Sequence, residues 1–436
     1  MPGASAEGTP GDLVDLTIDQ PAVGGRMIAR HGGRIILVAG ALPGERVRAR
    51  IDWVRRDVPL ASVEEVVVAD ADRRPAADDA TCGGNVFAHI AYPRQLALKA
   101  EIVADAFARI GRLTPPGPLT IAPSPEHGYR LRARLHAAGA RLGFLRAGSH
   151  LPCDATRTGQ LAPATGEVVA GLEQVLRNRG DGHGVRGIDL AESIGGDQRA
   201  IQVWLDRAHQ ASEATLGALA EVPGVTGVAA AVRRREPPRV VAGEPIVAES
   251  WSAILPSRPS EGGELRRRPA SFFQGNRFLL PALVERVLGE IGDGAVVDLY
   301  AGVGLFALAV AACGAHDVTA VEEDPVSRED LAGNAQRAGG RVRVVGRSVE
   351  RYLRGRRPTA SGVWIVDPPR TGLSRDARGR VAAVGPPRLV YVSCDVATLA
   401  RDLGTLTAAG YALRRLDGFD LFPNTAHIEL VATLER

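Results

Sequence analysis

Two polar residues near the C-terminus could together perform covalent catalysis. Cys394 ends the apolar run RLVYVSC, directly before a polar segment that begins a helix. A thiol at a helix start is expected to have a lowered pKa and is a candidate nucleophile, although most free cysteines are small buried core residues. Glu429 shares a strand face with His427 in FPNTAHIELVATL. Alone, this strand predicts only a solvated face, but beside a nucleophile Glu429 could be a general base.

A glycine-rich turn indicates a nucleoside-containing cofactor. In DLYAGVGLF, Asp298 ends an apolar strand, and Gly302 and Gly304 would let the backbone approach a ligand closely. A lone GxG is weak evidence, because tight turns use glycine for purely conformational reasons. Glu322 ends the next strand about 20 residues later, where a carboxylate can bind both ribose hydroxyls. Ala307 stands at the third glycine position of the dinucleotide-binding motif. The motif tolerates alanine there, so the turn alone does not exclude a dinucleotide cofactor such as NAD.

A third candidate is Asp367, which opens the rigid loop DPPR directly after the apolar strand VWIV. Taken alone, the motif is as compatible with a capped Pro-Pro turn as with a functional loop. Its predicted position beside the glycine turn favours function. A carboxylate there can line both a cofactor pocket and a substrate pocket.

These candidates lie in a segment where strands and helices alternate, from residue 271 to 436. This alternation predicts an α/β fold with a doubly wound parallel sheet. Ligands bind such sheets outside the carboxyl ends of the strands, where we expect the candidate residues. The one long apolar stretch, residues 295–313, could pass for a membrane span. Asp298 and two glycines in its first half favour a buried strand, loop and helix instead.

The length of 436 residues predicts about three domains. Residues 1–70 alternate as short strands and predict a small β-barrel, with Arg46, Arg48 and Arg50 on one basic face. The segment DADRRPAADD is a predicted linker. Residues 75–265 form a mixed α/β central domain, with Arg130, Arg132 and Arg134 together on one side. Residues 268–436 are the predicted catalytic domain.

Composition permits nucleic acid as a partner without proving it. The net charge is only +3, but Lys99 is the single lysine among 53 basic residues. A GC-rich genome explains most of this bias, although guanidinium groups also suit phosphates and stacked bases. Further arginines cluster at 233–235, 266–268, and 354 with 356 and 357. The N-terminus lacks the pattern of a secretory signal, so we expect a cytoplasmic protein.

The motifs together resemble the RNA uracil-5 methyltransferases, which use S-adenosylmethionine. The resemblance rests on the order and spacing of FFQGN, DLYAGVGLF, VEED with GNAQ, VDPPRTG, YVSCDVATLARDL and FPNTAHIE. It implies a class I, Rossmann-like methyltransferase domain. The segment GGRMIARHGGRIILVAGALPGERVRARI resembles the TRAM domain, an OB-like RNA-binding barrel. CGGNVFAHIAYPRQLALK and YRLRARLHAAGARLGF resemble the central domain of the family, which we also expect to bind RNA.

The resemblance also implies roles for individual residues. Cys394 would be the nucleophile that adds to carbon 6 of uracil, and Glu429 would accept the proton from carbon 5. Phe272 and Asn276 would flank the cofactor or the target base. S-adenosylmethionine would be held by Gln274, Tyr300, Gly302, Glu322 and Asp367.

Some positions depart from the family pattern. Ala301 replaces a usual cysteine, and Leu305 replaces a usually polar residue near the cofactor. Asp395 stands where the family often has asparagine, and its charge is expected to raise the pKa of the neighbouring thiol.

Many relatives hold an iron–sulfur cluster with four cysteines of the central region. Cys82 matches one of them, but its partners align with Ala76, Asn85 and a position near Thr158, with Cys153 out of register. One thiolate cannot hold a cluster, so we predict none. The four cysteines contain no CxxC pair and suggest neither a disulfide framework nor a zinc ribbon.

The leading hypothesis is an enzyme that makes 5-methyluridine in RNA, with ribosomal RNA slightly favoured over transfer RNA. A catalytically silent RNA-binding protein is the main rival, and the intact Cys394, Glu429, Asp367 and Gln274 argue against it. A nitrogen methyltransferase would favour an aromatic residue where Arg370 stands, and would need no thiol. A NAD-dependent oxidoreductase lacks a hydride-transfer site. We expect a monomer with no membrane partner, and phosphate contacts near Arg46, Arg132 and Arg266.

Overall fold

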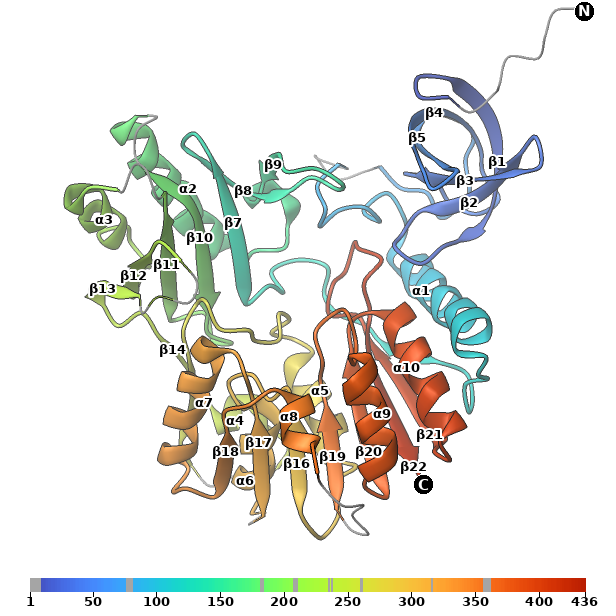
Figure 1. The fold of residues 1–436 in the computed structure, drawn as a ribbon. Coiled ribbons are helices and arrows are strands. Elements are labelled where there is room, and N and C mark those ends of the chain that lie inside the picture. The colour runs from blue at the N-terminus through green and yellow to red at the C-terminus, as the bar shows by residue number, and fades with distance from the viewer. Residues whose placement is uncertain are drawn as a thin grey trace, which may run out of the picture.

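The N-terminal part of the chain folds into a closed five-stranded barrel (Figure 1). The computed structural model describes residues 9–75, 81–180, 184–206, 211–233, 236, 238–258, 262–314, 317–355 and 362–436. Neighbouring strands follow the order β1-β2-β3-β5-β4. The strands are β1 (Leu13–Pro21), β2 (Met27–His31), β3 (Arg34–Ala39), β4 (Arg46–Arg55) and β5 (Val58–Val68). Alternate residues of β1 and β4 are buried, as their sequence pattern predicts.

The predicted basic face of the barrel is largely neutralised. Arg48 is the register partner of Asp15 on β1 and of Glu65 on β5. Its guanidinium pairs with both carboxylates, at 3.0 Å and 3.3 Å. Arg50 pairs with Glu64 at 2.6 Å. The prediction of a basic face is therefore wrong for Arg48 and Arg50, because the neighbouring strands place acidic residues opposite them.

A seven-stranded sheet forms the central part, with the strand order β13-β12-β11-β10-β7-β8-β9. Its strands are β7 (Arg132–Ala138), β8 (Arg141–Leu145), β9 (Pro152–Asp154), β10 (Val185–Glu192), β11 (Arg199–Leu205), β12 (Gly227–Ala231) and β13 (Arg239–Gly243). Helices α2 (Pro163–Arg179) and α3 (Glu213–Ala220) pack on it around a shared apolar core. A small hairpin, β14 (Val247–Ser250) and β15 (Glu264–Arg267), with α4 (Trp251–Ile254) between its strands, leads to the C-terminal part.

The C-terminal part is built on an eight-stranded sheet of order β18-β17-β16-β19-β20-β22-β21-β6. Its strands are β6 (Thr120–Ala122), β16 (Val296–Leu299), β17 (Val318–Val321), β18 (Val342–Val345), β19 (Val363–Val366), β20 (Arg388–Ser393), β21 (Ala412–Phe419) and β22 (Glu429–Glu435). Strands β16 to β20 are parallel, and β22 is antiparallel to both β20 and β21.

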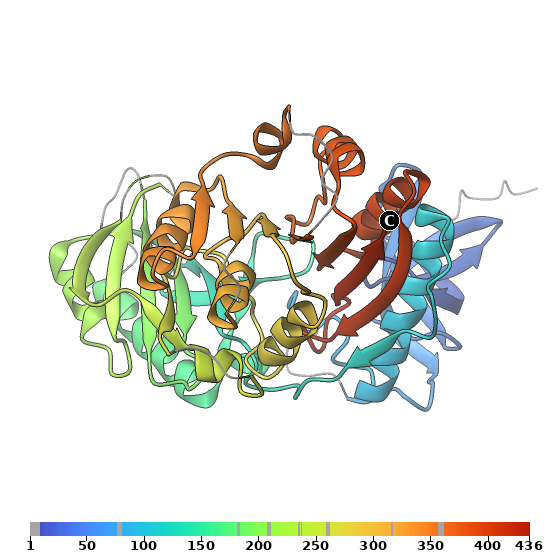
Figure 2. The same ribbon diagram turned by 90° about the horizontal axis from the view of Figure 1, so that it is seen from below.

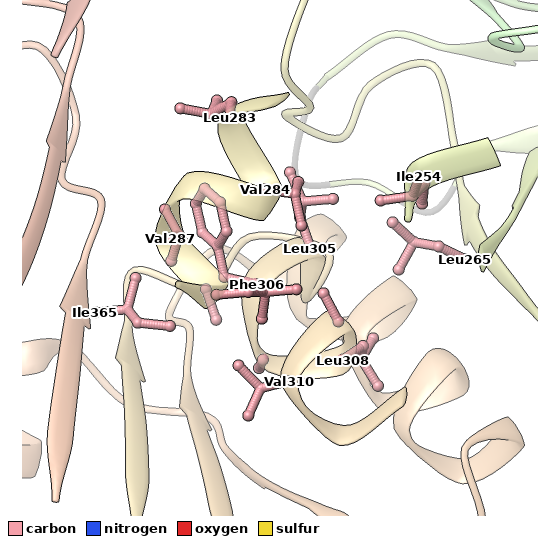
Figure 3. Close-up of a cluster of buried hydrophobic side chains, with 14 of the residues drawn as sticks. Ile254, Leu265, Leu283, Val284, Val287, Leu305, Phe306, Leu308, Val310 and Ile365 are labelled. Atoms are coloured by element: carbon pink, nitrogen blue, oxygen red, sulfur yellow. The ribbon is translucent and has the colours of Figure 1, made fainter. Parts of the chain in front are cut away.

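Helices cover both faces of this sheet (Figure 2). They are α5 (Leu280–Leu288), α6 (Leu305–Ala312), α7 (Pro325–Arg337), α8 (Val349–Leu353), α9 (Arg375–Val384) and α10 (Val396–Ala408). One face packs on α5, α6 and α7, the other on α8, α9 and α10. Figure 3 shows Val284, Val287 and Phe306 close together in the first of these cores. The prediction of a doubly wound sheet is thus confirmed for its architecture.

The structure confirms the prediction for one segment and corrects it for another. Residues 295–313 form β16, a turn and α6, so the predicted buried strand, loop and helix is confirmed. Helix α1 (Tyr92–Ala106), the π-helical turn Phe107–Gly111 and β6 were predicted to belong to the central domain. Instead, β6 extends the C-terminal sheet as a parallel neighbour of β21, and the π-helical turn packs on α10. No helix within the described parts of the chain is long and apolar enough to cross a membrane.

Candidate active site

A tight turn joins β16 to α6 at the carboxyl edge of the sheet. Tyr300, Gly302 and Gly304 have φ angles of 66°, 57° and 96°, in the left-handed region that glycine adopts most readily. A Cβ atom on Gly304 would lie 2.6 Å from Leu308 Cδ1 and 2.7 Å from Leu331 Cδ1, so a larger residue would need both to move. Tyr300 keeps this conformation without being glycine, a strain that is common at functional sites.

Glu322 fastens the glycine turn to the end of β17. Its Oε2 accepts a hydrogen bond from the Gly302 amide at 2.8 Å, and its Oε1 accepts one from the Asp324 amide at 2.6 Å. Burial raises the pKa of this carboxyl group, while hydrogen bonds from these two amides and from the Glu323 amide lower it. The residue is therefore fixed beside the turn in a place that suits its predicted role with ribose.

Asp298 lies inside β16 and is fully buried. The Ala307 amide, in the first turn of α6, donates to Oδ2 at 3.0 Å. Oδ1 has no hydrogen-bond partner, and burial raises the pKa of the carboxyl group well above its usual range. Asp298 thus positions the start of α6 and leaves one buried polar atom unsatisfied.

Gln274 and Asp367 meet although they come from distant segments. Gln274 Nε2 donates to Asp367 Oδ2 at 3.4 Å, and Gln274 is almost completely buried. Asp367 directly follows β19, one strand away from the glycine turn on β16. Burial raises its pKa to about 7, against the opposite effect of the hydrogen bond from Gln274.

Cys394 directly follows β20 and is partly buried. Burial raises the pKa of its thiol to about 12. The charges of Glu429 and Asp367 add to that effect, and Arg370 opposes it. The prediction of a lowered thiol pKa at the helix start is therefore wrong for the ligand-free protein, because desolvation outweighs the helix.

Asp395 has a structural role beside the thiol. Its Oδ1 accepts the Thr398 amide at 2.9 Å and caps α10. The largest carboxylate contributions to the raised pKa of Cys394 come from Glu429 and Asp367. The predicted effect of Asp395 on the thiol stays a prediction.

Glu429 is the first residue of β22 and is 2% exposed. Because Leu430 pairs with Ser393 in the antiparallel β20–β22 ladder, the next positions along the two strands are Glu429 and Cys394. Burial and the neighbouring Asp367 raise the pKa of Glu429 well above its usual range, and Arg370 lowers it. The protonated form of Glu429 is therefore favoured in this environment.

Arg370 and His427 complete the polar surroundings. Arg370 follows the Pro-Pro turn and is exposed, and its charge stabilises both the thiolate of Cys394 and the carboxylate of Glu429. Burial lowers the pKa of His427 to about 4, with a further contribution from Arg370, so its imidazole is neutral. The sequence showed both residues in the motifs but did not predict these effects.

Asp402 is a positioning residue that the sequence analysis missed. It lies on α10, is fully buried, and accepts the Leu373 amide and the Tyr391 hydroxyl, both at 2.7 Å. Arg378 pairs with it at 2.6 Å. These contacts fix the loop that carries Arg370. The only available signal was an aspartate among the apolar positions of a predicted helix.

The other residues predicted near the cofactor or the target base differ in their exposure. Phe272 is 52% exposed and free to contact a ligand. Asn276 is fully buried: its Nδ2 donates to Ser124 Oγ and to the Leu421 carbonyl, at 2.8 Å and 3.1 Å. Its role is structural, which differs from the ligand contact that the resemblance implied. Ala301 and Leu305 are buried in the apolar core.

The structure brings Cys82 and Cys153 together as a disulfide, which the sequence analysis did not predict. The two are 71 residues apart in the sequence and fully buried. Within the described ranges, no group of three or more potential ligands could hold a metal ion. Two disulfide-bonded sulfurs do not offer the four thiolates of an iron–sulfur cluster. The absence of a cluster stays a prediction.

Several of the predicted RNA-contacting arginines have protein partners. Arg134 pairs with Asp189 at 2.8 Å, and Arg130 stacks over the Phe144 ring at 4.7 Å. Arg266 pairs with Glu244. Arg233 pairs with Glu236 at 3.4 Å. Residues 234, 235, 356 and 357 lie outside the described residues.

Comparison with known proteins gives consistent matches. Residues 342–436 match a family described as tRNA (Uracil-5-)-methyltransferase. An uncharacterized RNA methyltransferase of Nitratidesulfovibrio vulgaris is 34% identical, over 98% of this chain and 96% of that protein. The 23S rRNA (uracil(1939)-C(5))-methyltransferase RlmD of Halomonas elongata is 32% identical, over 97% and 89%.

A solved structure shares the fold. It is the Pyrococcus abyssi tRNA (uracil-54, C5)-methyltransferase in complex with S-adenosyl-L-homocysteine, with a TM-score of 0.75 and 21% identity. The match covers 96% of this chain and 99% of that one. The overall fold is therefore similar over nearly the whole length.

Proposed function

This chain belongs to the RNA uracil-5 methyltransferase family, and from this membership we propose that it transfers a methyl group from S-adenosylmethionine to carbon 5 of a uridine in RNA through a covalent cysteine adduct. The observation that carries the proposal is the register of the β20–β22 ladder, whose last pair, Ser393 and Leu430, brings Cys394 and Glu429 to adjacent positions just beyond it. A nucleophile and a proton acceptor are the two groups that methylation of this carbon requires.

The residues present fit S-adenosylmethionine. The left-handed glycine turn allows close approach of a ligand to the backbone, and Glu322 is held beside it. Asp298 Oδ1 is buried without a partner, and Gln274 hydrogen-bonds to Asp367 just beyond the end of the neighbouring strand β19. We assign the binding of the cofactor to Gln274, Tyr300, Gly302, Glu322 and Asp367. The bound cofactor would supply an electrophilic methyl group.

The side chains of this chain activate the uridine. The Cys394 thiolate adds to carbon 6 of uracil, and the electron pair of the 5,6 double bond makes carbon 5 nucleophilic. Once carbon 5 carries the methyl group, Glu429 removes its proton. The electrons of that bond restore the double bond, and the carbon–sulfur bond breaks to release Cys394. The uridine must leave any base stack to reach these groups.

Activation of these groups depends on their charges. Burial raises the pKa of the Cys394 thiol to about 12 and that of Glu429 well above its usual range, so the charged form of each group is disfavoured. Arg370 stabilises both charged forms. We infer that its guanidinium makes the thiolate and the carboxylate accessible when RNA is bound.

The RNA class is a finer proposal. We favour ribosomal RNA, since relatives that match nearly the full chain carry that name. The Pyrococcus abyssi enzyme, which is named for transfer RNA, supports the alternative. A catalytically silent RNA-binding protein would not need Cys394 beside Glu429.

The test is incubation of the full chain with methyl-labelled S-adenosylmethionine and unmodified ribosomal or transfer RNA, in separate reactions. Labelled 5-methyluridine in one pool, absent with Cys394→Ala, would support the reaction and name the RNA class. RNA binding without label in either pool would favour the silent binder.

A further inference from the structure

The loop that leads into Glu429 is held from several sides. It covers residues 420–428, between β21 and β22. The Phe87 amide donates to the Asn424 carbonyl at 2.8 Å, and Asn276 Nδ2 donates to the Leu421 carbonyl at 3.1 Å. Asn424 has a left-handed φ of 63°. The loop therefore depends on outside contacts for its conformation, and its conformation sets where β22 begins.

Helix α1 makes the most extensive of these contacts, through two residues one turn apart. Gln95 Nε2 donates to Asn424 Oδ1, and its Oε1 accepts the Asn424 amide, both at 2.9 Å. Lys99 Nζ donates to Asp420 Oδ1 at 2.5 Å and to the Phe422 carbonyl at 3.2 Å. Gln95, Lys99 and Asp420 are completely buried. Together the two side chains hold both ends of the loop's first half.

The amino acid at position 99 is unusual for this chain. Fifty-two of its 53 basic residues are arginine, including the buried Arg267, and Lys99 is the single lysine. An ammonium group is compact and has three donors, whereas a guanidinium is a wide planar fork. A lysine here indicates a pocket shaped for a small cation between Asp420 and a backbone carbonyl.

Helix α1 also joins the barrel to the catalytic part. Leu98 and Ile102 pack in the barrel core, and Val103 and Ala106 pack in the core that contains α10. Figure 1 shows α1 between the barrel and the C-terminal sheet. The barrel touches the loop directly as well, since a Cβ on Gly25 would lie 2.6 Å from Ala426 Cβ. One helix thus contacts the barrel, the catalytic core and the loop before Glu429.

We propose that Gln95 and Lys99 are positioning residues for Glu429, which fix loop 420–428 so that the carboxyl group meets carbon 5 of the bound uridine. This inference rests on the proposed function. Its consequence is specific: loosening the loop impairs proton removal, which follows methyl transfer, and leaves the addition of Cys394 intact. The methylated RNA then stays attached to the protein.

The experiment compares the full-length wild type with Lys99→Met under the methylation assay above. SDS gels measure the fraction of RNA covalently attached to protein, and released 5-methyluridine measures turnover. We expect kcat to fall roughly 10- to 100-fold while KM for S-adenosylmethionine is unchanged. The SDS-stable adduct should rise in the same reactions. Gln95→Leu should show the same adduct at a smaller loss of rate.

Arg199→Met is the matched control, because it breaks another buried ion pair, with Glu192 at 2.8 Å, between β10 and β11 of the central sheet. It should lose stability without raising the adduct fraction. If Lys99→Met does not fold, the double variant Lys99→Met/Asp420→Asn, which leaves no unpaired charge, takes its place. An adduct fraction equal to that of the wild type in the folded variant would overturn the inference. Failure of the proposed function would be visible separately, as a wild type that forms neither adduct nor product.

Discussion

Ser393 and Leu430 are partners across the antiparallel β20–β22 ladder. The two residues beyond this pair are Cys394 and Glu429, which follow and precede it along the chain. A thiol and a carboxyl group thus come to adjacent positions at the carboxyl edge, beside Asp367 and Arg370, which both influence the pKa of the thiol. The register of one strand pair therefore assembles the two groups that the reaction needs.

Removing either group should stop turnover at a different stage. Cys394→Ala should form neither product nor covalent RNA adduct, because no thiolate adds to carbon 6. Glu429→Gln should add and methylate but fail to eliminate, so we expect an SDS-stable RNA–protein adduct with product formation reduced at least about 100-fold. Gel mobility and labelled nucleoside analysis measure both. A Glu429→Gln variant that releases product at the wild-type rate would show that another base removes the proton from carbon 5.

Arg370 should control the pH dependence of the rate. It lowers the pKa of both Cys394 and Glu429, so the wild-type rate should rise with pH as both ionise. Arg370→Gln should shift the profile to higher pH, with a loss of about 10-fold or more at pH 7 that shrinks toward pH 9. Arg370→Lys keeps a charge and should lie between. A loss that is equal at every pH would indicate a contact with RNA instead of an electrostatic effect.

The positions of the strand ends could be predicted from the sequence. Apolar runs followed by Glu322, Asp367 and Cys394 indicated parallel strands, and parallel strands bring their carboxyl ends to one edge. The glycine turn could also be predicted, because the sequence has glycine at positions 302 and 304, where the backbone adopts positive φ angles.

Contacts between distant segments were not predictable from the sequence. The Arg48 partners arise from the register of three barrel strands, and that register is not visible in the local pattern. The thiol pKa depends on burial, which only the packed fold determines. The assignment of α1 failed for the same reason, since its apolar face fits either neighbouring core.

Replacing Asp367 should stabilise the protein while it removes activity. Burial raises its pKa from about 4 in the unfolded chain to about 7. The stability that this group contributes is present below the unfolded pKa and is lost as the pH rises through 7. Asp367→Asn does not ionise, so its advantage in unfolding free energy over the wild type should grow by about 1 to 3 kcal/mol from pH 5 to pH 8. Urea unfolding at both values tests this, and an advantage that is constant or falls with pH would contradict it.

The glycine turn should be required for binding the cofactor. Gly304→Ala would bring its Cβ to 2.6 Å from Leu308 and would strain a φ of 96°. We expect affinity for S-adenosylmethionine to fall by about 10-fold or more, measured by calorimetry without RNA. Gly314→Ala is the control, because its φ of 97° is equally unusual but nothing lies within 4 Å of the added Cβ. Equal losses in both variants would mean that the effect is general destabilisation.

The cysteine pair of the central part makes a prediction independent of catalysis. The bond between Cys82 and Cys153 closes a long loop, and such a crosslink stabilises a fold by about 2 to 4 kcal/mol. Protein denatured without reductant should therefore show only the Cys313 and Cys394 thiols. Cys82→Ser should lower the melting temperature under oxidising conditions but not in the presence of reductant, and Cys313→Ser should not reproduce this difference. Iron analysis of protein purified without oxygen should find far less than the four atoms of a cluster. Stoichiometric iron that disappears in Cys82→Ser would show that these cysteines hold a cluster instead of forming a disulfide.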